Sequence, residues 1–433
     1  MNTRKIKITS GRLIAIGFLS IILVGTILLM LPVSHNDGVD VSLVDAFFTS
    51  TSAVCVTGLV AFDTGQTFSL FGRTVVAILI QLGGLGVTTF GLGFMLFLRK
   101  KAGIRELSLA KESFNYPTVK GVMQLIRTVL AASAFFEILG ALLCMPVFLK
   151  KYGLIEAIGY SLFHSVASFN NAGFDIFGTG DSMYAYIYHV YLNIVTAGLI
   201  IFGGLGFFVI SELLMYKKSK KFSLHTKVVL SASVFLIAVG ALCLKLTEGE
   251  GLSWLGAFFT SVSARTAGFS TFPISELSNA GIVVMIVLMV IGASPGSTGG
   301  GIKTTTAFVL VKHLFAYSTH SDTGAFKRKI PEDAIRKAFA IIMLAVCVIM
   351  LCTVFLCVLE PHLTIRDILF EVSSAFGTVG LSTGITSQLC DASKLIIICT
   401  MFIGRLGPLT IATLWINYAD TGLSRAEESI QIG

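Results

Sequence analysis

Apolar residues run along almost the whole chain in segments of two lengths. Segments of about 20 residues or more can cross the ~30 Å hydrocarbon core of a bilayer as helices, whereas segments of about 12 residues are too short. Each short segment stands between two long ones, and this order recurs four times. The predicted segments, in chain order, are 12–32, 41–53, 70–98, 121–149, 155–168, 183–215, 224–245, 252–263, 277–316, 336–359, 365–376 and 392–418.

An internal repeat coincides with this alternation. The sequences FTSTSAVCVTGLVAF, HSVASFNNAGFDIF, FTSVSARTAGFSTF and EVSSAFGTVGLSTG align on Gly58, Gly173, Gly268 and Gly380. A phenylalanine stands ten residues before each of these glycines. The pattern predicts an all-α integral membrane protein with a single transmembrane domain, residues 1–433. Each repeat consists of a helix, a re-entrant half-helix with a glycine strand, and a second helix. This gives eight transmembrane helices, in repeats 1–100, 120–216, 222–318 and 334–420.

Composition excludes several classes of protein. Hydrophobic residues make up 54% of the chain and charged residues 13%, which leaves no stretch suited to a separate soluble domain. The eight cysteines show neither a CxxC motif nor the spacing of metal ligands, so we expect packing residues. No basic patch is interleaved with aromatic residues, and no acid–base pair or metal cluster stands out. Neither a nucleic-acid partner nor an enzyme is therefore expected.

The basic residues predict the orientation in the membrane. Most of the 32 lysines and arginines stand in the N-terminus and in the three links between repeats. Loops within repeats hold few, such as Lys150, Lys151, Arg366 and Lys394. By the positive-inside rule, both termini are then cytoplasmic, in agreement with an even number of spans, and the glycine strands approach from the outer side.

Four glycine strands at membrane depth favour an ion pore. Irregular backbone leaves carbonyl and amide groups unpaired, and the membrane tolerates this only inside protein or along a water-filled cavity. Carbonyl oxygens from four strands can replace the hydration shell of a monovalent cation, while the C-terminal dipoles of the half-helices add negative potential. Each glycine taken alone is equally consistent with tight packing. The predicted filter residues are Val56, Thr57, Gly58, Asn171, Ala172, Gly173, Thr266, Ala267, Gly268, Thr378, Val379 and Gly380.

The stretch IGASPGSTGGGIKTTT, residues 291–306, superficially resembles a phosphate-binding loop. Gly296 and Gly301 have the spacing of that motif, but Ile302 separates Gly301 from Lys303, and no strand precedes the stretch. The other repeats carry GGLG, GGLG and GRLG at equivalent positions, where small residues predict close helix packing. In the third repeat a proline and several glycines predict a broken helix beneath the filter. Residues 292–304 are therefore expected to form a mobile plug, whose gate residues are Gly292, Ser294, Pro295, Gly296, Ser297, Thr298, Gly299, Gly300, Gly301 and Lys303, together with Arg405.

Arg405, in FIGRLGPLT, stands near the middle of the predicted membrane span. A charge at this depth usually faces the bundle interior or a water-filled path, although a structural ion pair is the alternative. The residue could both raise the barrier for cations and bind carbonyls of the plug. Arg265 and Asp175 flank filter strands and could tune them or pair between helices. Glu137 could bond to a half-helix or line a polar pocket.

The motifs VCVTGL, NNAGF, RTAGF and GTVGL, with GASPGSTGGGIKT and GRLGP, resemble those of the Trk/Ktr/HKT superfamily of potassium transporters. The resemblance covers nearly the full chain and is closest to the membrane subunits of bacterial Ktr systems. It implies K⁺ uptake through a pseudo-fourfold pathway with a gating loop and a pore arginine. Superfamily members with serine at the first filter position are associated with Na⁺ preference, and this chain has Gly58 there.

The same resemblance implies a homodimer in the bacterial cell membrane, seated on a cytoplasmic ring of nucleotide-binding regulatory subunits. The C-terminal SRAEESIQIG could serve the dimer contact or be a frayed tail. No covalent cofactor is expected, K⁺ is the substrate, and Na⁺ is a candidate activator. A secondary symporter that couples K⁺ to Na⁺ or H⁺ is the alternative function, because broken helices also occur in that class.

Overall fold

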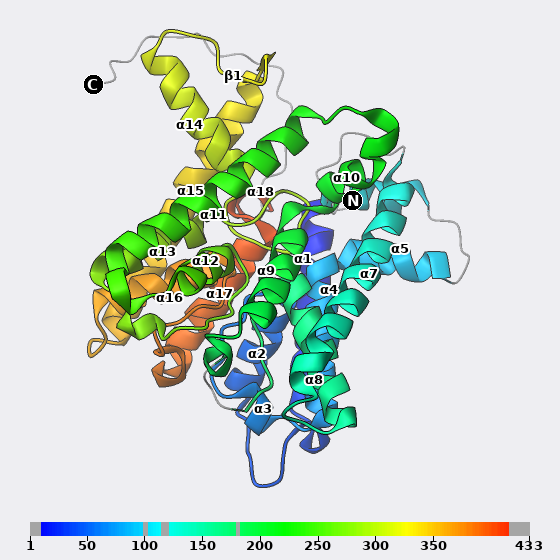
Figure 1. The fold of residues 1–433 in the computed structure, drawn as a ribbon, viewed down its shortest axis with the longest axis vertical. Coiled ribbons are helices and arrows are strands. Elements are labelled where there is room, and N and C mark those ends of the chain that lie inside the picture. Colours follow the sequence, from blue (N-terminus) through cyan, green and yellow to red (C-terminus); the bar gives the residue numbers. More distant parts are fainter. Residues whose placement is uncertain (1–9, 98–102, 114–120, 179–181, 415–433) are drawn as a thin grey trace, which may run out of the picture.

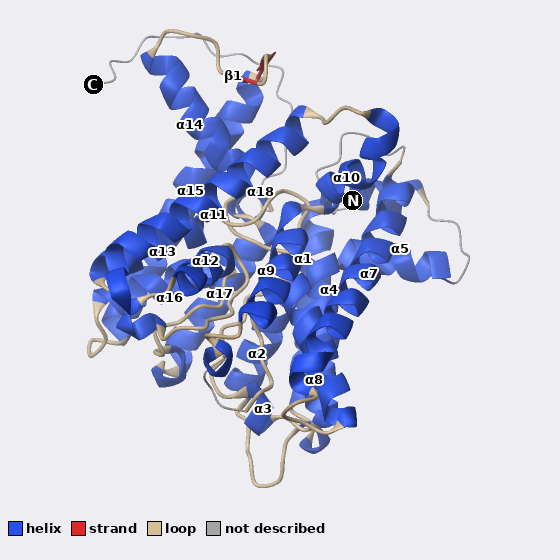
Figure 2. Ribbon diagram, viewed as in Figure 1, coloured by secondary structure: helices blue, strands red, loops and turns tan. Residues whose placement is uncertain are grey.

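The computed structural model describes residues 10–97, 103–113, 121–178 and 182–414 of the chain. Helices dominate it, and they surround a core of loops near the centre of the molecule (Figure 2). The only strands in these ranges are β1 (Gly324–Ala325) and β2 (Arg328–Lys329), which pair as an antiparallel hairpin. The fold class is therefore all-α, as the sequence predicts.

Four helices are long, uninterrupted and apolar. They are α1 (Ser10–Leu29), α7 (Val122–Phe148), α11 (Leu224–Glu248) and α15 (Glu332–Leu359). Large apolar side chains remain exposed along each of them, among them Ile27, Leu142, Phe235 and Phe355. Exposed apolar surface of this kind suits helices that face lipid.

Each long helix is followed by a short helix whose C-terminal half is buried. The four short helices are α2 (Leu43–Cys55), α8 (Leu154–Phe169), α12 (Trp254–Ser263) and α16 (Ile365–Gly377). Three of them, α2, α12 and α16, have capped starts, because the side chains of Ser42, Ser253 and Thr364 accept hydrogen bonds from backbone N–H groups of the first turn. Their C-terminal ends converge on the centre of the molecule, so their negative dipole ends meet there.

The remaining long segments are not continuous helices. Each consists of two helices: α4 (Leu70–Leu85) and α5 (Val87–Phe97), α9 (Val190–Leu205) and α10 (Phe207–Ser219), α13 (Asn279–Val290) and α14 (Thr304–Ser318), and α17 (Asp391–Leu406) and α18 (Pro408–Thr413). The predicted break in 277–316 is confirmed, but the prediction of unbroken helices over 70–98, 183–215 and 392–418 is wrong.

Glycine at the end of each GGLG or GRLG motif explains these breaks. Gly86, Gly206 and Gly407 have φ values of +81°, +91° and +89°, which glycine adopts without steric cost. The bend between α9 and α10 reaches 100°. The close packing that the sequence predicts for these motifs occurs at their first glycine, because a Cβ on Gly83, Gly203 or Gly404 would overlap a carbonyl oxygen of a half-helix.

Short helices and turns complete the described chain: α3 (Thr64–Thr67), α6 (Ile104–Ser113), and the 3₁₀ turns η1 (Pro32–Ser34), η2 (Tyr184–Tyr186), η3 (Gly249–Gly251), η4 (Ile274–Glu276) and η5 (Thr386–Gln388). Within the described residues, four helices are long and apolar enough to cross a membrane, or five if the bent pair α9 and α10 counts as one span. The number of eight spans stays a prediction.

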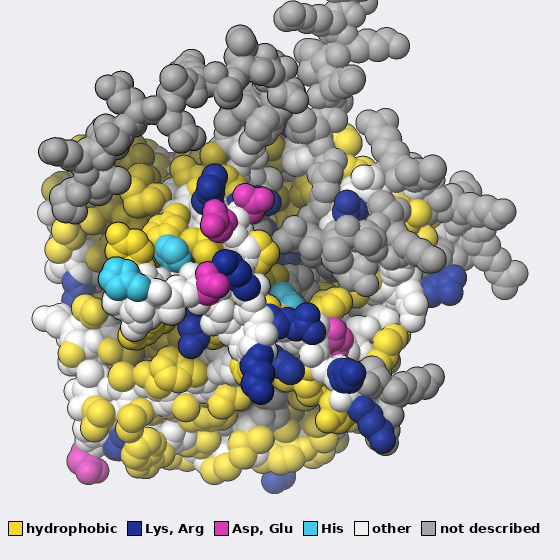
Figure 3. All heavy atoms as spheres, turned by 90° about the horizontal axis from the view of Figure 1, so that it is seen from above, with side chains coloured by type: hydrophobic (Ala, Val, Ile, Leu, Met, Phe, Trp, Pro, Cys, Tyr) yellow, Lys and Arg dark blue, Asp and Glu magenta, His cyan; other side chains and the backbone are white. Residues whose placement is uncertain are grey.

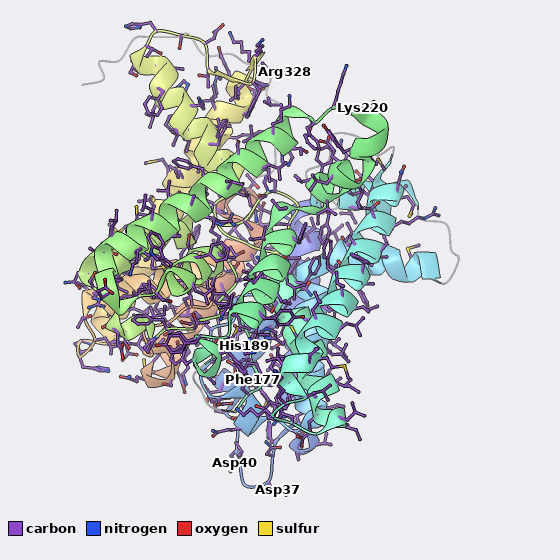
Figure 4. All side chains as sticks on the ribbon, in the orientation of Figure 1. Asp37, Asp40, Phe177, His189, Lys220 and Arg328 are labelled. Atoms are coloured by element: carbon purple, nitrogen blue, oxygen red, sulfur yellow. The ribbon has the colours of Figure 1, made fainter. Side chains whose placement is uncertain are left out.

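The two ends of the molecule differ in charge. Lys220 and Arg328 lie at the end that carries α10 and β1, whereas Asp37 and Asp40 lie in a loop at the opposite end (Figure 4). Seen from the first end, the surface shows a gathering of Lys and Arg side chains (Figure 3). Arg4, Lys5 and Lys7 near the N-terminus, residues 415–433 and parts of the first link lie outside the described residues.

Candidate functional site

Four glycines, each just after the end of α2, α8, α12 or α16, meet in a closed ring. Figure 1 labels these four helices. Each lies against the backbone of the next strand. Gly58 faces Ala172 and Gly173, Gly173 faces Ala267 and Gly268, Gly268 faces Val379 and Gly380, and Gly380 faces Thr57 and Gly58. Segments far apart in the sequence are thus brought together through single glycines.

The ring leaves no room for a side chain at these four positions. A Cβ on Gly173 would lie 2.8 Å from the carbonyl oxygen of Ala267 and 2.9 Å from Cα of Gly268. A Cβ on Gly380 would overlap the carbonyl oxygen of Thr57 and lie 2.9 Å from Cα of Gly58. Because the obstacles are backbone atoms, they cannot move aside as a flexible side chain could.

The backbone of each strand alternates in handedness. In all four strands φ is positive two residues before the glycine, at Val56, Asn171, Thr266 and Thr378, and positive again at the glycine. A regular extended strand points successive carbonyl groups to opposite sides. Alternation in the sign of φ turns them toward one side instead, so each strand can present a row of oxygen atoms.

Serines in the last turns of the half-helices hold this unusual backbone. The N–H of Gly58 donates to Oγ of Ser52 at 3.0 Å, and the N–H of Gly380 donates to Oγ of Ser374 at 3.1 Å. In the third strand, Oγ of Ser263 donates to the carbonyl of Phe269. The first, third and fourth strands are therefore anchored to the helices that precede them.

A cavity of about 630 Å³ opens on one side of the ring. All four ring glycines contribute to its wall, together with the segments that follow them in the chain. Asp63 and Asp175 also line it. Their carboxylates would attract cations into the space above the ring.

Residues 291–303 form a loop that closes the other side of the ring. The N–H of Gly300 donates to Oγ1 of Thr378 at 3.0 Å, and a Cβ on Gly299 would overlap Oγ1 of Thr266. Both threonines stand two residues before a ring glycine. The loop thus lies against the inner ends of two strands, and Gly299, Gly300 and Thr298 are buried there.

This loop also caps the helices that break around it. The C-terminal carbonyl groups of a helix have no partner inside the helix and need one from elsewhere. In α9, the carbonyl of Gly203 accepts from the N–H of Thr298 at 3.4 Å, and that of Gly204 accepts from Ser294 at 3.1 Å. In α17, the carbonyl of Gly404 accepts from the N–H of Gly301 at 3.3 Å.

Arg405, at the end of the broken helix α17, joins the loop to the end of a second broken helix, α4. Its guanidinium donates to the carbonyl of Thr298 in the loop and to the carbonyls of Gly83 and Gly84 at the end of α4. Arg405 itself stands in the last turn of α17. One side chain therefore supplies the caps of α4 and holds the loop at the same time.

Lys303 is the last residue of the loop, and its side chain points back into the loop. Its Nζ donates to the carbonyl of Gly299 at 2.7 Å and to that of Gly300 at 3.2 Å. The lysine thus stabilises the loop segment nearest the ring.

The other predicted gate residues shape the ends of the loop. The N–H of Gly292 donates to the carbonyl of Ile302 at 2.8 Å, so the two ends of the loop lie side by side. Oγ of Ser294 lies 3.2 Å from Oγ1 of Thr304. The carbonyl of Gly296 accepts from Phe207 at 2.9 Å, Pro295 contacts Gly206, and Ser297 is half-buried beside them.

Comparison with known proteins places the chain in a family. The family model described as TrkH, cation transport protein, matches residues 12–422. The chain belongs to the TrkH family. The resemblance to the Trk/Ktr/HKT group, expected from the ring motifs, is thereby confirmed.

Three relatives match the chain over nearly its full length. The chain is 38% identical to the Ktr system potassium uptake protein B of Bacillus subtilis, over 94% of this chain and 92% of that protein. It is 37% identical to the potassium/sodium uptake protein NtpJ of Enterococcus hirae, over 99% and 98%. It is 36% identical to the Ktr system potassium uptake protein B of Vibrio alginolyticus, over 99% and 96%.

The fold agrees with a solved member of the TrkH family. The crystal structure of the potassium transporter TrkH from Vibrio parahaemolyticus superposes with a TM-score of 0.71, covering 95% of this chain and 86% of that one. The sequences are only 19% identical, so this likeness concerns the fold alone.

Three charged residues outside the ring have defined places. Glu137 on α7 accepts a hydrogen bond at 3.0 Å from Asn170, at the end of α8, which confirms a bond to a half-helix. Asp175 accepts from the N–H of Phe177 at 3.2 Å and lines the cavity. Arg265 is only 7% exposed and lies in the third strand.

Several residues that hold the site are absent from the predicted set. The carbonyls of Gly83, Gly203 and Gly404 accept hydrogen bonds that fix the loop, and Ser52 and Ser374 hold the strands. The recurrence of serine near the end of each half-helix is the signal that could have revealed the anchors. Carbonyl acceptors leave no trace in a sequence, because every residue carries one.

Proposed function

We propose that this member of the TrkH family takes up K⁺ across the bacterial cell membrane through the ring of Gly58, Gly173, Gly268 and Gly380, and that the loop 291–303 gates the path. The observation that carries the proposal is the closed ring of four glycine strands between a cavity and a buried loop. The relatives named potassium uptake proteins support K⁺ as the substrate.

The pathway that we infer has three parts. Cations enter the cavity of about 630 Å³, where Asp63 and Asp175 favour them, and then lose water to the carbonyl oxygens of the strands. The four residue sets that line this filter are Val56 to Gly58, Asn171 to Gly173, Thr266 to Gly268 and Thr378 to Gly380. Below them the loop blocks the way until it moves.

We infer a pseudo-fourfold arrangement of eight spans. Each pair of broken helices counts as one span in this proposal, because its two parts follow each other across a single break of one residue or, in the third repeat, across the loop. The end rich in Lys and Arg faces the cytoplasm by the positive-inside rule, and both termini lie on that side.

Gating in this proposal means an exchange of hydrogen bonds. In the closed state the loop and Arg405 cap the ends of α4, α9 and α17. Displacement of the loop removes these caps, so water that enters the open path must replace them. The cost of uncapping biases the resting protein toward the closed state.

The proposed assembly is a homodimer on a cytoplasmic ring of nucleotide-binding regulatory subunits. The support is the membership of the TrkH family and the basic end of the molecule, which offers a surface to such a ring. Residues 415–433, where a dimer contact was considered, lie outside the described residues. We propose Na⁺ as an activator of this pathway, not as a bound cofactor.

One experiment tests the function and its alternative. The purified protein in proteoliposomes should take up K⁺ along an imposed membrane potential without stoichiometric entry of Na⁺ or H⁺. Obligatory co-ion entry would establish the symporter. The broken helices and the similarity to the potassium/sodium uptake protein NtpJ support this alternative. Absence of K⁺ uptake under every gradient would overturn both.

A further inference from the structure

A single carboxylate is buried directly behind the fourth strand of the ring. Glu371 stands in α16, immediately after Phe370, and its side chain is 0% exposed. A buried polar group is costly unless hydrogen-bond partners compensate for the lost water. The donors that surround Glu371 therefore indicate why the chain retains it.

Both donors come from the segment that follows Gly380. Oγ of Ser382 donates to Oε2 of Glu371 at 2.7 Å, and Oγ1 of Thr386 donates to Oε1. Ser382 in turn accepts from the N–H of Gly384 at 2.9 Å. The oxygens of a carboxyl group accept hydrogen bonds, so two hydroxyl donors, one on each oxygen, match its chemistry.

This bonded segment forms part of the cavity wall beside the ring. Ser382, Gly384 and Thr386 all line the cavity of about 630 Å³, together with Gly380. The carboxylate thus ties the outward continuation of the fourth strand to the half-helix that precedes that strand. The direction of the Gly380 backbone depends on both of these attachments.

The other three strands lack this device. The residues at the equivalent position, each directly after the shared phenylalanine, are Thr49, His164 and Phe259. Among the described residues, Oγ1 of Thr49 has no hydrogen-bond partner, and Nε2 of His164 bonds to Thr196 on α9. Among the residues that the structure describes, the fourth strand is therefore the only one held by a carboxylate from its own half-helix.

We infer that Glu371 is a positioning residue that fixes the fourth strand through Ser382 and Thr386 and thereby sets the preference for K⁺ over Na⁺. The inference rests on the proposed function, because it concerns the same ring. Discrimination between these cations depends on how many carbonyl oxygens surround the ion and how firmly they are held. A released strand can move inward around the smaller Na⁺ ion.

The test measures rubidium and sodium uptake by purified protein in proteoliposomes. Glu371→Gln keeps the shape but replaces one acceptor oxygen with a donor, and Glu371→Asp keeps the charge while shortening the reach. We expect Glu371→Gln to lower the rubidium-to-sodium uptake ratio roughly tenfold, the size of the loss of one hydrogen bond to a charged group. Glu371→Asp should restore part of the ratio.

Glu360→Gln serves as the matched control. Glu360 is 3% exposed and accepts from the N–H of Cys390 at 2.7 Å, but it does not line the cavity. This variant should leave the ratio unchanged. If Glu371→Gln cannot be purified in folded form, the double variant Ser382→Ala, Thr386→Val removes the same bonds from the other side and should lower the ratio.

Two results would overturn the inference: a wild-type ratio in folded Glu371→Gln, or a wild-type ratio in the double variant. Either leaves the proposed function standing, because the wild type still takes up rubidium. A wild-type protein that takes up neither rubidium nor K⁺ would instead contradict the proposed function itself.

Discussion

The guanidinium of Arg405 donates a hydrogen bond to the backbone carbonyl of Thr298, a residue 107 positions earlier in the chain. The same guanidinium reaches the carbonyl of Gly83 in another quarter of the sequence. One side chain thus fixes the loop beneath the glycine ring to two broken helices. In the proposed gate, Arg405 therefore stabilises the closed state.

Arg405→Ala should therefore increase K⁺ flux. The variant loses the hydrogen bonds to Thr298 and Gly83, and a loss of about 2 kcal/mol would shift the ratio of closed to open protein about 30-fold. Arg405→Lys should show a smaller increase, because lysine keeps the charge but lacks the planar fork of donors. Uptake in a bacterium deficient in K⁺ transport measures both. If flux in Arg405→Ala equals or falls below that of the wild type at equal expression, Arg405 does not stabilise the closed state.

Shortening the loop should also increase flux. The ends of the loop already lie side by side, since the N–H of Gly292 bonds to the carbonyl of Ile302. A deletion within residues 294–301 can therefore be closed without moving α13 or α14, and it removes the backbone beneath Thr266 and Thr378. Flux should rise without a change in ion preference, because the ring is untouched. A deletion variant with wild-type flux would contradict the gate.

Two glycines, each within a helix, should respond differently to alanine. A Cβ on Gly404 would lie 2.8 Å from the carbonyl carbon of Phe376, at the end of α16, whereas a Cβ on Gly198 in α9 meets nothing within 4 Å. Gly404→Ala should lower the free energy of unfolding by about 1–3 kcal/mol. Gly198→Ala should be neutral or raise it by up to about 1 kcal/mol. Thermal unfolding in detergent compares them, and equal midpoints would refute the close approach.

The helices and the ring motifs could be predicted from the sequence because their signals are local. Apolar length identifies α1, α7, α11 and α15, and the glycine after each half-helix recurs at a fixed distance from a phenylalanine. The proposed filter residues follow from that register alone. The predicted bounds of the half-helices agree with the structure to within two residues at each end.

The breaks at Gly86, Gly206 and Gly407 could not be predicted in the same way. A single glycine within an apolar run is compatible with a continuous helix, so its effect depends on what caps the broken end. Those caps come from Arg405 and from the loop of the third repeat, which are distant in sequence. Glu371 escaped notice for a related reason: its partners Ser382 and Thr386 are ordinary polar residues until the strand turns back on α16.

The most direct test of the account is the ion preference of Gly58→Ser. Gly58 has a φ of +91°, and a Cβ there would overlap the carbonyl oxygen of Ala172 and lie 3.0 Å from Cα of Gly173. Gly153→Ser is the matched control, because Gly153 has a φ of −62° and open space around it. Rubidium and sodium uptake into proteoliposomes should show a lower rubidium-to-sodium ratio in Gly58→Ser and the wild-type ratio in Gly153→Ser. A wild-type ratio in folded Gly58→Ser would contradict the assignment of the glycine ring as the filter.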